Sequence, residues 1–212
     1  MKNRDIILKR LNDALNLDLK NLWYAMPSEK YSSEAEYLIH SRLVIILSGE
    51  KNAFLPLSSG NKSIHLSTGD MLYCLPKSWE LHEWKGEYEM LCIVPRKDYL
   101  RVSLYINRSF DNTVRAVPVF HHTGLSYPES MRHVLGALNS SWNTKDKEAS
   151  SYLLKSLITM CIYECKRKVF NPEGQSKILY NRMQNWVSNS FQEDISRDVV
   201  ARVFGVSPGY VS

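Results

Sequence analysis

The histidines are the first residues to consider for chemistry, because imidazole is the commonest metal ligand in proteins. His40, His65 and His82 stand apart from one another, and no H-x-H pair occurs. His121 and His122 are adjacent, so on a strand they would point to opposite faces and could not hold one ion together. The sequence therefore disfavours a metal centre, and it predicts neither a catalytic set nor a cofactor.

A second group of residues could bind a small molecule. The stretch W-E-L-H-E-W, residues 79 to 84, would place Trp79, Leu81 and Glu83 on one face of a strand and the alternate residues on the other. A ligand pocket combines apolar faces for burial with a few polar tips for orientation. The predicted ligand-binding residues are Trp23, Tyr24, Tyr73, Glu80, His82 and Trp84. The alternative is that these aromatic side chains simply fill a core.

The C-terminal stretch from Asp194 to Ser212 has the pattern of a DNA-binding motif. Ser196 can cap a short helix with one apolar stripe, Gly205 can end it, and Ser207 can cap a second helix. Helix, glycine turn and helix form a helix-turn-helix, whose second helix enters the DNA major groove. The predicted DNA-contacting residues are Arg197, Ser207, Pro208, Gly209, Tyr210 and Ser212. The alternative is an ordinary pair of capped helices in a bundle.

The distribution of charge limits what this motif can do alone. The chain carries a net charge of +5, but from residue 171 onward it has four basic residues (Lys177, Arg182, Arg197, Arg202) and four acidic ones (Glu173, Glu193, Asp194, Asp198). Phosphate contacts need Lys and Arg. Because the chain also ends at Ser212, early in the expected recognition helix, we expect it to lack most of the DNA-reading surface and to bind specific DNA weakly or not at all.

The elements that would position these residues change character along the chain. Residues 5–20 repeat apolar groups at helical spacing, whereas short runs rich in β-branched and aromatic residues follow between about residues 22 and 120. The clusters S-G-E-K-N, S-S-G-N-K, S-T-G-D and K-G-E read as turns between these runs. Seven or so strands in this spacing predict an antiparallel barrel or jelly roll, with residues 114–120 as its last strand.

Two helices are expected between about residues 128 and 168. The second carries two apolar stripes, which suggests two partners: the sheet and the same helix of a second chain. The predicted dimerisation residues are Leu154, Leu157, Ile158, Cys161 and Cys165. A single wide core face is the alternative interpretation of the same pattern.

The expected domain organisation follows from these elements. Residues 1–170 would form one domain, residues 171–176 (N-P-E-G-Q-S) a linker, and residues 177–212 the start of a second, all-helical domain. The four cysteines form no C-x-x-C pair, and the longest aliphatic run is residues 43–47, so the sequence predicts buried thiols and a cytoplasmic protein without a membrane segment.

Two stretches resemble a known family. I-S-x-x-x-V-A, F-x-V-S and Y-V-S, between Ile195 and Ser212, resemble the first helix-turn-helix of the bacterial AraC/XylS transcription regulators. The G-D-x-x-x-x-x-P turn, from Gly69 to Pro76, resembles that of the cupin-type effector domains which commonly precede this motif. Cupin enzymes hold their metals with an H-x-H pair and a following Glu, which this chain lacks.

The resemblance implies an α+β protein: a cupin-like sensing domain, two dimerisation helices and a partial helix-turn-helix segment. It implies a transcription regulator rather than an enzyme. The intact protein would bind promoter DNA, form a homodimer and respond to a small-molecule effector or a regulatory protein. The alternative function is a protein-interaction module, such as a truncated or anti-activating dimer partner, that makes no DNA contact.

Overall fold

The computed structural model describes two compact units, residues 1–168 and residues 169–212, which we treat separately. The described residues are 3–29, 32–96, 100–108, 119–122, 128–143 and 146–167 in the first unit, and 179–180, 183–184, 186–187, 195–204, 206 and 209 in the second. The expected linker, residues 171–176, lies outside them.

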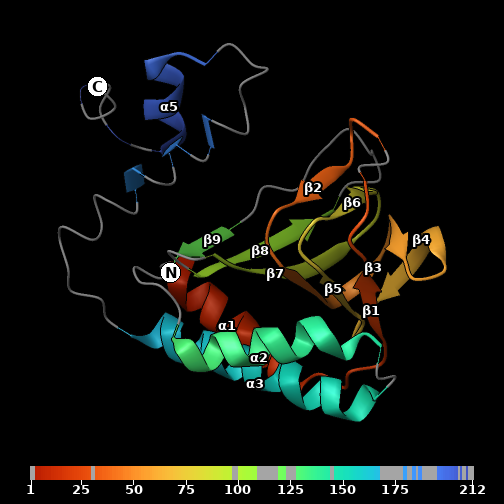
Figure 1. Ribbon diagram of the computed structural model, residues 1–212. Helices are drawn as coiled ribbons and strands as arrows, with labels where there is room; N and C mark the ends of the chain where they lie inside the picture. The colour runs from red at the N-terminus through yellow and green to blue at the C-terminus, as the bar shows by residue number, and fades with distance from the viewer. Residues whose placement is uncertain are drawn as a thin grey trace. The chain divides into compact units, whose positions relative to one another are not determined.

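The first unit mixes one connected sheet with helices, so its fold class is α+β (Figure 1). The helices are α1 (Asn3–Asn16), α2 (Glu129–Ser141) and α3 (Lys147–Lys166). The strands are β1 (Leu22–Ala25), β2 (Glu36–Leu38), β3 (Arg42–Leu57), β4 (Gly60–Ser67), β5 (Met71–Cys74), β6 (Ser78–His82), β7 (Tyr88–Pro95), β8 (Leu100–Asn107) and β9 (Val119–His122).

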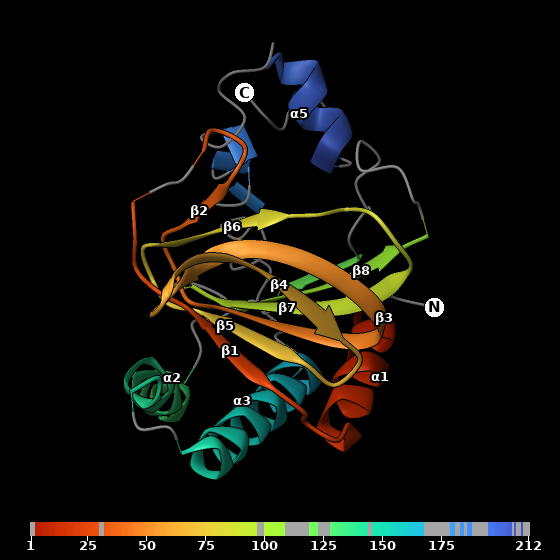
Figure 2. The same ribbon diagram turned by 90° about the vertical axis from the view of Figure 1, so that its right-hand side faces the viewer.

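Strand β3 connects the two portions of this sheet. The main path runs β1-β5-β3-β7-β8-β9, and its pairs are antiparallel except for the parallel pair β1–β5. The first half of β3 pairs with β5 and β7, whereas its second half pairs with β4 and β6. Strand β2 pairs with β6. Helices α1, α2 and α3 lie together on one side of the sheet, and β2 and β6 lie on the other (Figure 2).

The continuity of β3 corrects one sequence prediction. The cluster S-G-E-K-N reads as a turn, but residues 48–52 lie inside this 16-residue strand. The register with β7 shifts between Ile46 and Ser48, and Gly49 has a φ of 75°. A β-carbon at Gly49 would lie 1.9 Å from the carbonyl oxygen of Glu87. The glycine therefore allows a bulge that bends the strand instead of ending it.

The predicted G-D turn does form between β4 and β5. Gly69 has a φ of 91°, and the Asp70 carboxylate accepts hydrogen bonds from the backbone N–H of Ser67 at 2.8 Å and the side-chain amide of Asn21 at 2.9 Å. These bonds tie the turn to the segment before β1, so the buried carboxylate has a structural role.

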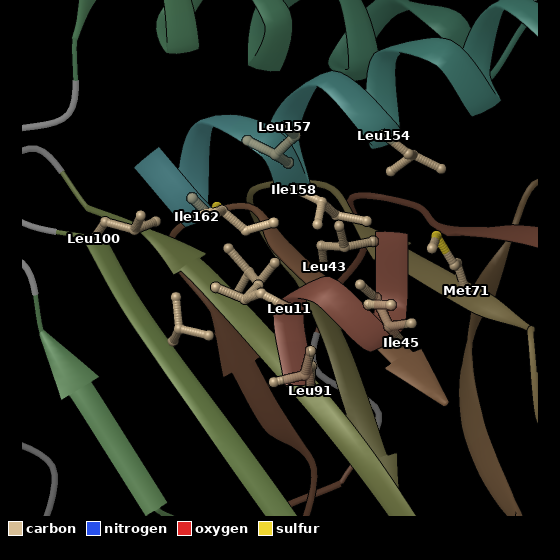
Figure 3. Packing of buried hydrophobic residues seen from close by; sticks show 14 of the residues in the cluster. Leu11, Leu43, Ile45, Met71, Leu91, Leu100, Leu154, Leu157, Ile158 and Ile162 are labelled. Carbon is tan, nitrogen blue, oxygen red and sulfur yellow. The ribbon is translucent and has the colours of Figure 1, made fainter. Parts of the chain in front are cut away.

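Alternating side chains of the sheet form two separate cores. On one side, Leu43, Ile45, Leu91 and Ile93 pack against α1 and α3 in what we call the helix-facing core (Figure 3). On the other side lies the inner core. There, residues from the first half of β3 and from β5 and β7 meet residues from the second half of β3 and from β4. Its members include Val44, Ile46, Leu72, Met90, Ala53, Leu55, Ile64 and Leu66.

Helix α3 uses its apolar surface within the chain. The predicted dimerisation residues Leu154, Leu157, Ile158, Cys161 and Cys165 are all buried in the helix-facing core. Of the stripe formed by Leu153, Leu157 and Met160, Leu157 is buried in this core and the other two are partly buried against it. The single wide core face is thus the arrangement in the structure, and a partner chain would have to contact other residues of α3.

Candidate functional site

Five ionisable side chains meet inside the sheet, and we call them the inner charge cluster. They are Glu36 of β2, Arg42 and Lys51 from the two halves of β3, and Glu80 and His82 of β6. The exposed fraction of the side chain is 0% for Lys51 and Glu80 and 9% for His82, compared with 52% for Glu36. Charged groups are almost never buried this completely unless they are paired.

Glu80 lies at the centre of the cluster. Its Oε1 is 3.1 Å from His82 Nδ1 and 4.0 Å from Lys51 Nζ, and its Oε2 is 3.8 Å from Arg42 Nη1. Arg42 also binds the Glu36 carboxylate with both terminal nitrogens, one of them at 2.7 Å. The carboxylates of Glu36 and Glu80 therefore lie among two basic side chains and an imidazole. Of the two bases, Arg is always charged in proteins and Lys ordinarily is.

Aromatic rings surround the Lys51 ammonium. Its Nζ lies 5.9 Å from the ring centroid of Trp84 and 5.6 Å from that of Tyr88. The His82 ring lies against Trp84, tilted by 42°, with centroids 4.9 Å apart, and the Tyr105 ring lies 6.0 Å from that of Trp84. The faces of these rings attract a cation, which partly offsets the loss of water around it.

Burial shifts the proton affinity of the cluster in opposite directions for its acid and its base. Burial raises the pKa of Glu80, although Lys51 and Arg42 lower it in part. Burial lowers the pKa of Lys51, against the attraction of Glu80. For Arg42, burial lowers the pKa but the attraction of Glu36 and other anionic groups outweighs it, so the guanidinium stays charged. Each charged form thus depends on its neighbours.

Several further polar groups on this side of the sheet are buried without a hydrogen-bond partner among the described residues. They are Trp23 Nε1, Ser78 Oγ, Tyr88 Oη and Ser103 Oγ. Each can donate a hydrogen bond. A buried group that makes no such bond costs about 1–3 kcal/mol, so these donors favour a bound molecule or ordered water in this region.

The six predicted ligand-binding residues divide between the two sides of the sheet. Glu80, His82 and Trp84 come together in and beside the inner charge cluster, and Trp23 packs against the inner core. Tyr24 and Tyr73 instead face the helices: Tyr24 Oη lies 2.7 Å from Ser141 Oγ, and Tyr73 Oη donates to Asn139 Oδ1 at 3.0 Å. These two tyrosines are therefore not part of the inner cluster.

Sequence reasoning missed both basic members of the cluster. Arg42 begins the run R-L-V-I-I-L, where it shares a face with Val44 and Ile46, and that alternation was the available signal. Lys51 lies in the stretch S-G-E-K-N, which reads as a turn in the sequence but is part of β3. In the part of the chain that the structure describes, no three His, Cys, Asp or Glu side chains are grouped as a metal site.

In the second unit, helix α5 (Arg197–Phe204) begins and ends with recognisable caps. The Ser196 hydroxyl accepts a hydrogen bond from the Val199 N–H at 3.3 Å, as an N-cap does. The Val206 N–H donates to the Ala201 carbonyl at 3.0 Å, which is the six-to-one bond of a Schellman ending. The predicted start and end of this helix are therefore present.

The buried side of α5 contacts the preceding helical residues. Val200 and Ala201 are buried, and the Phe204 ring lies edge-on to Trp186 with centroids 6.1 Å apart. Residues 183–184 and 186–187 are helical, as predicted, and Met183 is buried. A helix before α5 thus packs within this unit.

The predicted DNA-contacting residues are only partly visible. Arg197 and Gly209 are exposed, and Gly209 is part of a short 3₁₀ turn. Ser207, Pro208, Tyr210 and Ser212 lie outside the described residues. Elsewhere, none of the helices within the described ranges is long and apolar enough to cross a lipid bilayer.

Comparison with known proteins links this chain to regulators of transcription. No protein-family model and no solved structure matches it. It is 21% identical over 199 residues to the uncharacterized HTH-type transcriptional regulator YijO of Escherichia coli K12, and 21% identical over 194 residues to the similarly named YpdC of that organism. Each match covers 92% of this chain but 66% of the relative, just under two thirds of its length.

Both relatives are named as HTH-type transcriptional regulators. Each match covers 92% of the chain, which is more than the first unit alone, so each extends into both units. At 21% identity the similarity is distant.

Proposed function

We propose that this chain is a transcription regulator of the AraC/XylS type, with residues 1–170 as a sensing and dimerising domain, 171–176 as a linker and 177–212 as the start of the DNA-binding domain. The single observation that carries the proposal is the similarity to helix-turn-helix regulators over 92% of the chain. The capped α5, with Trp186 packed on Phe204, supports the motif at the residues where the family resemblance lies.

The inner charge cluster is the proposed sensing site. Its donors and acceptors are buried between two portions of a sheet, where a cupin-like domain would enclose an effector. The partnerless donors Trp23 Nε1, Ser78 Oγ, Tyr88 Oη and Ser103 Oγ favour a compact polar molecule, with aromatic rings packed around it. A regulatory protein partner is the other proposed input.

A homodimer remains part of the proposal, but with a different surface. The exposed face of α3 carries Tyr152, Ser156, Thr159 and Tyr163 at helical spacing, together with Lys155. A second chain would contact such residues, because the five predicted dimerisation residues are buried in the helix-facing core.

The test of the proposed function measures transcription and DNA binding with the same chain. Expressing it in its native host should change the transcripts of a small set of promoters, and Arg197→Ala, at an exposed position of α5, should weaken that effect. An unchanged set of transcripts would count against a regulator of any kind. In a gel shift at low salt, residues 1–212 should bind those promoters weakly and with little sequence preference, because residues 171–212 carry equal numbers of basic and acidic side chains.

That charge balance favours a second candidate function, a dimerisation module without DNA contact. Such a protein would act by forming mixed dimers with a full-length relative. Co-expression followed by size-exclusion chromatography would detect the mixed dimer. Tight, sequence-specific binding of DNA by this chain alone would contradict this candidate.

A further inference from the structure

Lys51 is the buried cation of the inner charge cluster that has no hydrogen-bonded anion among the described residues. Arg42 binds the Glu36 carboxylate with both terminal nitrogens. Lys51 Nζ instead lies 4.0 Å from Glu80 Oε1, which is too far for a hydrogen bond, and makes its hydrogen-bond contact with His82 Nδ1. Its side chain is 0% exposed. An ammonium buried in this way is stabilised by an anion within hydrogen-bond distance.

Around this ammonium, buried donors without a hydrogen-bond partner outnumber such acceptors in the described part of the chain. The acceptor is Glu80 Oε1. The atoms that can donate are Trp23 Nε1, Arg42 Nε, Ser78 Oγ, Tyr88 Oη and Ser103 Oγ. The interior therefore offers more hydrogen bonds to an acceptor than to a donor.

The pairing of the strands places these donors on the walls of one interior. A row of paired residues crosses the sheet from β1 to β8, and members of it belong to the inner core: Trp23, Leu72, Val44, Cys92 and Ser103. Arg42 lies two positions before this row on β3, and Ser78 lies two positions before Glu80 on β6, so each faces the same interior. The centroid of the Tyr88 ring is 5.6 Å from Lys51 Nζ.

This surplus of donors distinguishes between classes of ligand. A carboxylate supplies acceptor oxygens and no donor, whereas a sugar adds a donor with each hydroxyl and a phosphate brings more negative charge than one ammonium balances. Burial raises the pKa of Glu80, which favours the protonated form that donates to a second carboxylate instead of repelling it. The neighbouring rings of Trp84 and Tyr105 suit an apolar body.

We propose that the inner charge cluster binds a small organic monocarboxylate, with Lys51 Nζ and Tyr88 Oη donating to its oxygens and the aromatic rings packing on its apolar part. The ligand is small because Lys51 is fully buried within the sheet. As the effector of a transcription regulator this ligand rests on the proposed function, but its binding requires no DNA.

Tryptophan fluorescence of the full chain can report binding, because the Trp84 ring lies 5.9 Å from Lys51 Nζ. The probes are acetate, butyrate and isovalerate, each compared with its uncharged amide of the same shape. At least one carboxylate should change the emission with saturation, and its amide should not do so at the same concentrations. Equal responses to an acid and its amide, or no saturable response to any of the three acids, would overturn the proposal.

Two substitutions test the named donors. Lys51→Met should weaken binding of the carboxylate by about tenfold or more, and Tyr88→Phe, which keeps the ring, by about three- to tenfold. The matched control is Lys62→Met, which removes an exposed ammonium from β4 and should leave the affinity unchanged. Native affinity in Lys51→Met would overturn the proposal. If Lys51→Met does not fold, native affinity in Tyr88→Phe would do so.

Glu80→Gln tests the sign of the ligand's charge. It removes the carboxylate that lies 4.0 Å from Lys51, so the probe acid should bind this variant more tightly than the native chain and should raise its urea midpoint. A loss of affinity like that of Lys51→Met would contradict an anionic ligand. Transcripts that respond to Arg197→Ala but not to a carboxylate that binds would refute only its role as effector. Transcripts that respond to neither would count against the proposed function and leave the binding site in place.

Discussion

The two sides of the sheet are built from opposite faces of the same strands, yet they differ in chemistry, because the inner side holds the inner charge cluster beside its apolar core. Leu43 and Ile45 of β3 face helices α1 and α3 in a core of aliphatic, sulfur-containing and aromatic side chains. Arg42, one residue earlier, faces the inner side and reaches two carboxylates. Burial of apolar area stabilises the first core directly, whereas buried ion pairs often contribute little net stability. The difference teaches that the inner side is specialised for polar chemistry at some cost in stability.

Breaking the charge balance of the inner charge cluster gives the largest expected effect. Glu80→Gln keeps the shape of the side chain but leaves Lys51 buried with no carboxylate within 4.0 Å among the described residues. Removing one partner of a buried ion pair typically costs about 3–5 kcal/mol. We expect a decrease of this size in the free energy of unfolding at neutral pH, measured with urea.

The matched control is Glu87→Gln, which removes the same charge from an exposed side chain in the segment between β6 and β7. It should change the free energy of unfolding by less than about 0.5 kcal/mol. Similar values for the two variants would show that the inner core does not depend on its charges and would remove the contrast between the cores.

Truncating the helix-facing core should have a comparable but slightly smaller effect. Leu157 of α3 is fully buried there (Figure 3). Leu157→Ala should lower the free energy of unfolding by about 2–5 kcal/mol, because a transfer term and a cavity term add. Ser156→Ala, at the neighbouring exposed position, should stay within about 0.5 kcal/mol of the native chain. A small loss in Leu157→Ala would mean that α3 packs more loosely on the sheet than the structure indicates.

The helix-facing core was largely predictable from the sequence. Apolar residues at helical spacing predicted helices over residues 5–20, 128–142 and the region before 168, and α1, α2 and α3 lie close to those ranges. Period-two alternation in W-E-L-H-E-W placed Glu80, His82 and Trp84 on one face, and the structure brings them together. In both cases the repeat of the local helix or strand determines which side chains share a face, and a short stretch of sequence is enough to recognise that repeat.

The inner charge cluster was not predictable in the same way. Its members come from β2, both halves of β3 and β6, and residues 31 positions apart, Lys51 and His82, meet only through the pairing of β3 with β6. A glycine at residue 49 reads locally as a turn, and its role as a bulge depends on the close approach of Glu87. Strand β8 was also missed, although its alternating residues 100–107 pair along the whole of β7.

The smallest expected effect comes from β1, where two neighbouring residues point to opposite cores. Tyr24 lies on the helix side, hydrogen-bonded to Ser141, while Trp23 packs against the inner core. Tyr24→Phe should lower the free energy of unfolding by about 0.5–1.5 kcal/mol, the usual net contribution of one hydrogen bond. Tyr163→Phe, an exposed change on α3, should cost less.

The same variant also separates stability from the chemistry of the inner side. Because Tyr24 contacts α2 and not the inner charge cluster, Tyr24→Phe should leave the tryptophan fluorescence spectrum of the native chain at neutral pH unchanged. A changed spectrum would mean that the two sides of β1 are coupled through the strand. In that case a change beside the helices would alter the inner charge cluster, and the two sides of the sheet would not be independent.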